Sequence, residues 1–225
     1  MNFDTKYFFS LFGKLIAYAP LTLLIAVVAM ALAILIGGIV SGLELSKSKV
    51  LRGIGKLYVS FFRGMPTLVQ LFLIFYGLPQ LFPVFRGTPA IEAAIVALGF
   101  KEASYLAEIF RAGINSVDTG QIEAGDALHI SRSKLFFHIV LPQAFLNALP
   151  ATGNTFVSLL KETSLVFTLG ITELFGEGRM LAGSSFKYFE TYLALGIIYW
   201  LLIVLYTYLQ GIVERKLSIP YQGGV

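Results

Sequence analysis

Long apolar stretches alternate with short polar segments along the chain, in the pattern of a membrane protein. A helix needs about 20 apolar residues to cross the hydrocarbon core of a bilayer. The first stretch carries no charge, and it lacks the short apolar core and small-residue cleavage site of a signal peptide, so we expect a retained helix. The pattern predicts an all-α integral membrane protein, with one domain over residues 1–225 and five transmembrane helices. The expected spans lie at about residues 20–43, 57–78, 90–112, 143–165 and 189–211.

The segment before the first span is aromatic and carries a few lysines. Residues 5–18 fit an N-terminal interfacial helix that lies on the membrane and stops near Pro20. They fit equally well an extension of the first span. Two other segments are expected to be loops: residues 79–89, which hold three prolines, and residues 170–188, which are rich in Gly, Ser and charged side chains.

Composition supports the membrane assignment. Apolar residues make up 56% of the chain and charged residues only 13%, about half the ~25% of soluble domains. The chain has no cysteine, which excludes disulfides, thiol catalysis and thiolate metal sites. Nor do histidines and carboxylates stand at helical spacings that would predict a metal site.

The basic residues predict the orientation. Net charge is +4, and in a membrane protein such an excess orients loops more often than it binds nucleic acid. With five spans the termini lie on opposite sides of a cytoplasmic membrane, and the more basic side is cytoplasmic. We therefore expect a multi-pass protein with its N-terminus outside and its C-terminus inside. The basic side carries Lys47, Lys49, Arg52, Lys56, Arg63, Arg111, Arg132, Lys134, Arg215 and Lys216, and the other side carries Lys6, Lys14, Arg86, Arg179 and Lys187.

The polar stretch 113–142 is too organised for a disordered loop. Its apolar residues predict one short amphipathic helix, and a second apolar run ends at Pro142, which can begin the next span. Two short helices on a cytoplasmic loop would form a docking surface. The alternative is that they simply lie at the membrane interface.

This stretch also carries a family resemblance. The run GQIEAGDALHISRSKLFFHIVLPQA resembles the EAA loop of ABC importer permeases; Glu123, Ala124 and Pro142 match it, Gly125 stands at its third position, and His129 replaces the usual Gly. FRGMPTLVQLF at 62–72, SYLAEIFRAGINSVDTGQIEA at 104–124 and SLLKETSL at 158–165 are similar to the polar amino-acid permeases of that family. The resemblance extends from about residue 20 to 217, and FYGLPQLF, KETSL and ELF look most like cystine permeases.

The resemblance implies a type I permease fold in which the EAA loop is a coupling helix seated in an ATPase subunit. It implies that this chain is a transport subunit and not an enzyme; the sequence contains no G-x-x-x-x-G-K-[ST] phosphate loop. The chain would thus need no cofactor, because a partner ATPase dimer binds ATP and Mg. The other implied partners are a second permease copy or paralogue and an extracellular or periplasmic amino-acid-binding protein. The implied coupling residues are Glu123, Ala124, Gly125, Asp126 and His129.

His129 has two interpretations. It can be a tolerated residue in a turn that requires a positive φ, because His is among the better-tolerated non-Gly residues there. It can alternatively sense pH.

Polar side chains inside predicted spans are candidates for the transport path. In the fourth span, helical spacing places positions 154, 155, 158 and 162 on one face. Without the resemblance, this face could equally bind neighbouring helices. The resemblance implies a substrate cavity here, and the neutral Thr155 and Ser158 favour cystine, glutamine or another neutral polar amino acid. The candidate cavity residues are Lys101, Glu102, Asn154, Thr155, Ser158, Lys161 and Glu162.

Four further residues are expected to support gating. Glu108 and Arg111 stand three positions apart, as an ion pair on a helix does. Arg63 precedes Pro66, which is expected to bend or start the second span. Gly38 and Gly42 form a GxxxG pattern that allows close helix packing, although chance explains it as well. The competing function is an ion-driven secondary amino-acid transporter, which most often shows internal repeats that this sequence lacks.

Overall fold

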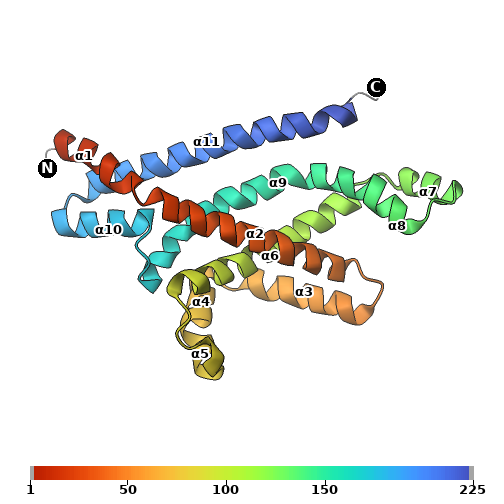
Figure 1. Cartoon of the computed structure of the whole chain (residues 1–225), viewed down its shortest axis with the longest axis horizontal. Coiled ribbons are helices and arrows are strands. Elements are labelled where there is room, and N and C mark those ends of the chain that lie inside the picture. The colour runs from red at the N-terminus through yellow and green to blue at the C-terminus, as the bar shows by residue number, and fades with distance from the viewer. Residues whose placement is uncertain (1–2, 223–225) are drawn as a thin grey trace.

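The computed structural model describes residues 3–222, with side chains to Leu217, and this part of the chain is helical without strands (Figure 1). A long crossed pair, α2 and α6, lies at the centre, with α9 and α11 to one side and α3 to the other. The fold class is therefore confirmed as all-α. The helices are α1 (Thr5–Ile16), α2 (Ala19–Glu44), α3 (Lys49–Gly64), α4 (Thr67–Phe72), α5 (Leu78–Leu81), α6 (Ala90–Asn115), α7 (Thr119–Ala127), α8 (Arg132–Leu135), α9 (Leu141–Glu162), α10 (Leu174–Ser185) and α11 (Tyr188–Gln222).

Not all five expected spans meet the requirements of length and composition. Within the described residues, three helical stretches are long and apolar enough to cross a membrane: Ala19–Glu44, Arg132–Leu169 and Tyr188–Leu217. A bent pair, Lys49–Gly64 with Thr67–Leu81, makes a fourth if it is one span. The remaining expected span, α6, has 26 residues but carries five charged side chains. The count of five is thus not reached by these criteria.

The expected span over 57–78 is broken at Pro66, where a bend or a helix start was predicted. The chain bends by 107° between α3 and the helical run Thr67–Leu81. Met65 is extended, at φ −102° and ψ 135°, because a residue before proline avoids the helical conformation. The amide of Gln70 donates to the carbonyls of Phe62, at 2.8 Å, and of Met65, at 2.9 Å. This side chain therefore satisfies backbone groups that the break at Pro66 leaves free.

The coupling loop is shorter than the predicted 113–142. α6 continues to Asn115, and helical structure resumes at Arg132 and runs through α9. Only α7 is a separate short helix; the second expected one is the beginning of the α9 stretch. A π-helical turn over Phe136–Val140 precedes Pro142. Local π-helical adjustment accommodates a proline, which has no amide to donate, without ending the helix.

The expected loop at 170–188 contains α10. Its three glycines and two serines suggest a loop, since these residues are weak helix formers. Packing explains two of these glycines: a Cβ would lie 3.0 Å from Leu195 of α11 at Gly178 and 3.0 Å from the Ile171 carbonyl oxygen at Gly176. The helix begins at the fully buried Glu173, whose carboxylate accepts hydrogen bonds from the Gly176 amide, Thr22 and Tyr199.

At the N-terminus, α1 is a helix distinct from α2, as one of the two interpretations requires. It lies beside the beginning of α11 and near α10 (Figure 1), and its Leu11 and Leu15 are fully buried there. Lys187 donates to Asp4 and holds the pKa of that carboxyl below its usual range. The stabilisation from this half-exposed pair is present at neutral pH and is lost as the pH falls through the lowered pKa of Asp4.

Small residues bring α2 and α6 together, but not through the GxxxG pattern. A Cβ on Gly37 would lie 2.9 Å from Leu106 Cβ and 3.1 Å from the Ala103 carbonyl oxygen. Gly38 and Gly42 have no such neighbour within 4 Å. The close helix contact therefore depends on Gly37, the residue before the first glycine of the GxxxG pattern.

Candidate functional site

The backbone conformation at the C-terminal end of α7 explains why His129 is tolerated at this position. The Ile130 amide donates to the Gly125 carbonyl at 2.9 Å, and the His129 amide donates to the Asp126 carbonyl at 3.1 Å. These two bonds form a Schellman motif, in which the residue after the C-cap adopts the left-handed conformation that favours glycine. His129 has φ 55°. This geometry agrees with the interpretation of His129 as a tolerated turn residue.

We expect His129→Gly to stabilise the end of α7 by roughly 1 kcal/mol, because glycine has no penalty in the left-handed region. Transport and its pH profile should remain unchanged. Hydrogen exchange of residues 119–130 and uptake between pH 5.5 and 8 would measure both effects. A flattened pH profile in this variant would instead support a pH-sensing role.

The outer face of α7 is open. Glu123 and Ala124 are exposed, and within the described residues the Glu123 carboxylate has no hydrogen bond or ion pair. Gly125 is buried on the opposite side, where an added Cβ would lie 2.5 Å from Leu135 Cδ1. A glycine at this third position of the motif therefore allows α7 to pack against α8.

Side-chain contacts attach α7 to the α8–α9 stretch. The Gln143 amide donates to Gln121 at 2.6 Å, and the Gln121 amide donates back at 3.2 Å. Arg132 lies 3.5 Å from Asp126. Leu135, the glutamine pair and this ion pair therefore connect α7 to the α8–α9 stretch.

The expected substrate residues divide into two groups, of which the first is a charged cluster. The Lys101 ammonium lies 2.7 Å from Glu102 and 2.6 Å from Glu162, so α6 and the end of α9 share a cation. Lys101 and Glu102 are buried, at 7% and 1% exposure. The Thr67 hydroxyl, just after the break in the second span, lies 3.5 Å from the other Glu162 oxygen.

Tyr105 connects this cluster to Arg63. The Lys101 ammonium lies 4.8 Å from the centre of the Tyr105 ring, and the Arg63 guanidinium lies 5.1 Å from it. Both distances allow a cation–π interaction. The predicted cavity residues Lys101, Glu102 and Glu162 and the predicted gating residue Arg63 therefore meet at the break.

The second group lies on α9, and one member departs from the expected face. Asn154, Ser158 and Lys161 are exposed, whereas Thr155 is 8% exposed and donates to the Ala151 carbonyl of its own helix at 3.0 Å. Successive helical positions are about 100° apart, so Thr155 turns into the packed side. Positions 154 and 155, which helical spacing places on one face, therefore differ in exposure.

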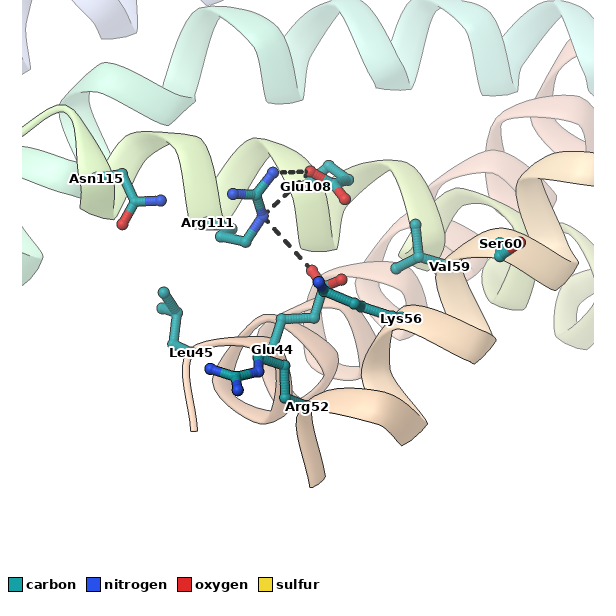
Figure 2. Close-up of a pocket in the computed structure, with 9 residues that line it drawn as sticks. All are labelled: Glu44, Leu45, Arg52, Lys56, Val59, Ser60, Glu108, Arg111 and Asn115. Atoms are coloured by element: carbon teal, nitrogen blue, oxygen red, sulfur yellow. Dashed lines mark hydrogen bonds and ion pairs between the residues drawn. The ribbon is translucent and has the colours of Figure 1, made fainter. Parts of the chain in front are cut away.

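Glu108 and Arg111 form the expected ion pair, and a third residue joins them. Arg111 Nε lies 3.7 Å from Glu44 at the end of α2 (Figure 2). Glu44 was not predicted, because nothing in the local sequence places the end of the first span beside α6. These side chains line a polar cleft of about 520 Å³, together with others. Its charged and amide side chains are Glu44, Arg52, Lys56, Glu108, Arg111 and Asn115.

Metal binding is not indicated in the described residues, where no group of three or more His, Cys, Asp or Glu side chains could hold an ion.

Comparison with known proteins agrees with this geometry. Residues 33–219 match the family model described as "Binding-protein-dependent transport system inner membrane component". A probable amino-acid permease, YxeN of Bacillus subtilis, is 53% identical over 97% of this chain and 98% of its own length. TcyL of the same organism, an L-cystine transport system permease protein, is 36% identical over 96% and 92%.

Among solved structures, the crystal structure of an amino acid ABC transporter with histidines contains a chain that is similar throughout. It has a TM-score of 0.87 and 31% identity, and the match covers 96% of this chain and all of that one. A family match over most of the chain and these amino-acid relatives together identify a transport component and not an enzyme. The chain belongs to the binding-protein-dependent transport system inner membrane components, as a permease subunit of the amino-acid ABC transporters.

Proposed function

We propose that the chain is the permease subunit of an ATP-driven importer for a neutral polar amino acid, with cystine as the first candidate. The paired Lys101 carries this proposal: its ammonium already neutralises charge on Glu102 and Glu162, so these carboxylates are not both free for a cationic substrate. The exposed Asn154 and Ser158 supply neutral hydrogen-bonding groups nearby on α9. The similarity to TcyL, which is named as an L-cystine transport permease, supports cystine as the substrate.

In this proposal α7 is the coupling helix. Its open face, with Glu123 and Ala124, binds a cleft of a partner ATPase, and that partner dimer holds ATP and Mg. Two permeases, either two copies of this chain or this chain and a paralogue, enclose the path. A separate amino-acid-binding protein delivers substrate on the opposite side of the membrane.

Uptake into proteoliposomes tests the proposal. The permease, reconstituted with its ATPase and binding protein, should accumulate labelled cystine or glutamine only with internal ATP, and arginine poorly. We expect Asn154→Leu to lower the rate by about tenfold, because a lost hydrogen bond to a charged group costs about 1.5–3 kcal/mol. Val213→Leu on α11, also exposed, serves as control. Uptake that requires an ion gradient and not ATP would refute the importer assignment.

The proposed orientation places the N-terminus outside and the C-terminus inside, as the distribution of basic residues indicates. The chain has no cysteine, so a single introduced one gives a clean signal. A membrane-impermeant maleimide should label Lys6→Cys in intact cells and should label Lys134→Cys only after lysis. The reverse pattern would contradict this orientation.

A further inference from the structure

The polar cleft of Figure 2 lies where the first span ends. α2 is apolar over most of its length and reaches polar chain at Glu44 and Ser46, which is where a spanning helix meets the headgroup region. The cleft lies between the end of α2, α3 from Arg52 to Ser60, and the last turns of α6 (Figure 2). Its level along the helices is therefore that of lipid headgroups.

Only some of the charged side chains in this cleft form ion pairs within the described residues. Arg111 is engaged by Glu108 and Glu44. Arg52 and Lys56, by contrast, are exposed and take part in no ion pair among the described residues. Two free cations on one wall are suited to a phosphate group.

The same cleft also holds an anion, Glu44, which packs against Gly55 of α3. The Glu44 side chain is only 4% exposed, and its Oε2 has no hydrogen-bond donor. Arg111 Nε lies 3.7 Å from this oxygen, beyond hydrogen-bonding distance, so a ligand that brings an N–H group gains from binding there. Cations and an anion in one cleft complement a headgroup that carries both a phosphate and an ammonium.

An apolar groove of about 650 Å³ meets the polar cleft at Leu45, which lines both. Neighbouring residues on α6 divide between them: Arg111 and Asn115 face the cleft, whereas Phe110 and Ile114 face the groove. The groove follows α2 from Leu45 back to Ile34, past Gly38 and Gly42, whose missing side chains help to form it.

The length of the groove fits one lipid chain. Eleven residues of helix, from Ile34 to Leu45, correspond to about 16 Å at 1.5 Å per residue. One leaflet of the hydrocarbon core is about 15 Å thick. Ser41, which lines the groove, has a hydroxyl without a hydrogen-bond partner among the described residues. It stands at the level at which the glycerol ester oxygens of such a lipid would lie.

We propose that the cleft and groove together form a binding site for an aminophospholipid of the phosphatidylethanolamine type. The phosphate binds Arg52 and Lys56, the ammonium binds Glu44, and one acyl chain follows α2 past Gly38. A lipid in this site connects α2, α3 and α6 at the end of the molecule that carries α7.

Native mass spectrometry of the purified, delipidated transporter tests this site. The complex is incubated with phosphatidylethanolamine, phosphatidylglycerol or phosphatidylcholine of identical chains. Retention of phosphatidylethanolamine should exceed that of phosphatidylcholine, whose methylated ammonium cannot donate a hydrogen bond to Glu44. Arg52→Gln/Lys56→Gln should lower retention on the order of tenfold. The matched control is Lys47→Gln/Lys49→Gln, which removes two cations of the same segment outside the cleft.

Two further variants separate headgroup from chain. Glu44→Gln should lower the retention of phosphatidylethanolamine but not of phosphatidylglycerol, which lacks an ammonium. Gly38→Leu should fill the groove and lower the retention of both, whereas Gly211→Leu, at a position equally free of neighbours on α11, should not.

Three outcomes would overturn the site. The first is equal retention of the three lipids, and the second is equal loss in the Arg52/Lys56 variant and its control. The third is displacement by soluble phosphoethanolamine as effective as by the intact lipid, which would indicate a free zwitterion in the cleft and no use of the groove.

Discussion

Reversing the charge of Glu123 is expected to abolish transport. Glu123 is exposed on α7 and makes no ion pair or hydrogen bond within the described part of the chain, so Glu123→Lys should change the stability of the permease by less than about 0.5 kcal/mol. Its effect on transport would then come from the ATPase that we propose α7 contacts. Loss of a charge pair at an interface costs about 2–5 kcal/mol, so we expect uptake to fall by about 30-fold or more.

Uptake and co-purification of the ATPase, measured on the same preparation, distinguish loss of the complex from uncoupling within it. Glu92→Lys, an equally exposed acidic position in the first turn of α6, is the matched control and should retain transport. Glu123→Gln should lie between the two variants. Wild-type uptake in Glu123→Lys would remove α7 from the coupling role.

The second large effect is expected at Lys101. Lys101→Met removes the cation that Glu102 and Glu162 share and leaves Glu102, at 1% exposure, as a buried charge without a partner. Breaking a buried pair in this way costs about 3–5 kcal/mol. We therefore expect a large drop in the melting temperature of the purified transporter, together with poor expression.

A second substitution tests whether the unpaired charge is the cause. Lys101→Met/Glu102→Gln removes the buried charge as well and should recover most of the lost stability, since an uncharged replacement of a buried pair is often neutral. Lys161→Met, which removes an exposed lysine of α9 beside Glu162, should melt within a few degrees of the wild type. Equal destabilisation by Lys161→Met, or no recovery in the double variant, would contradict the shared-cation interpretation.

The elements that could be predicted from the sequence are those with strong local signals. The uncharged run of the first span is α2, and the aromatic run at the end of the chain is α11. The EAA-like motif marks α7, which ends just before the turn at His129. Each of these signals comes from the chemistry of adjacent residues, so no knowledge of the fold is required.

The predictions from sequence failed where contacts between separate elements determine the conformation of a segment. Pro66 predicted a bend, but its size, 107° between α3 and the next helical run, was not predictable, nor were the hydrogen bonds from Gln70 to the carbonyls of Phe62 and Met65 at the break. The segment of α10 reads as a loop because its glycines are weak helix formers, yet one of them, Gly178, allows close packing against Leu195 of α11.

Single residues also show that packing decides what the local sequence does not. Asn154 and Thr155 differ by one position, and only the packing of α9 turns Thr155 inward and leaves Asn154 open. Glu44 joins Glu108 and Arg111 because α2 and α6 cross. Gly37, and not the Gly38 and Gly42 of the motif, faces α6.

By itself, the sequence determined that this protein is a helical membrane protein whose contiguous motif resembles that of ABC permeases, because hydropathy, charge distribution and such a motif are properties of neighbouring residues. Only the tertiary structure decided which charges neutralise one another, as Lys101, Glu102 and Glu162 do, and which polar groups remain open to a ligand. The physical reason is that the energy of a buried charge depends on atoms within a few ångströms in space, and α6, α9 and α4 bring those atoms together from separate parts of the chain.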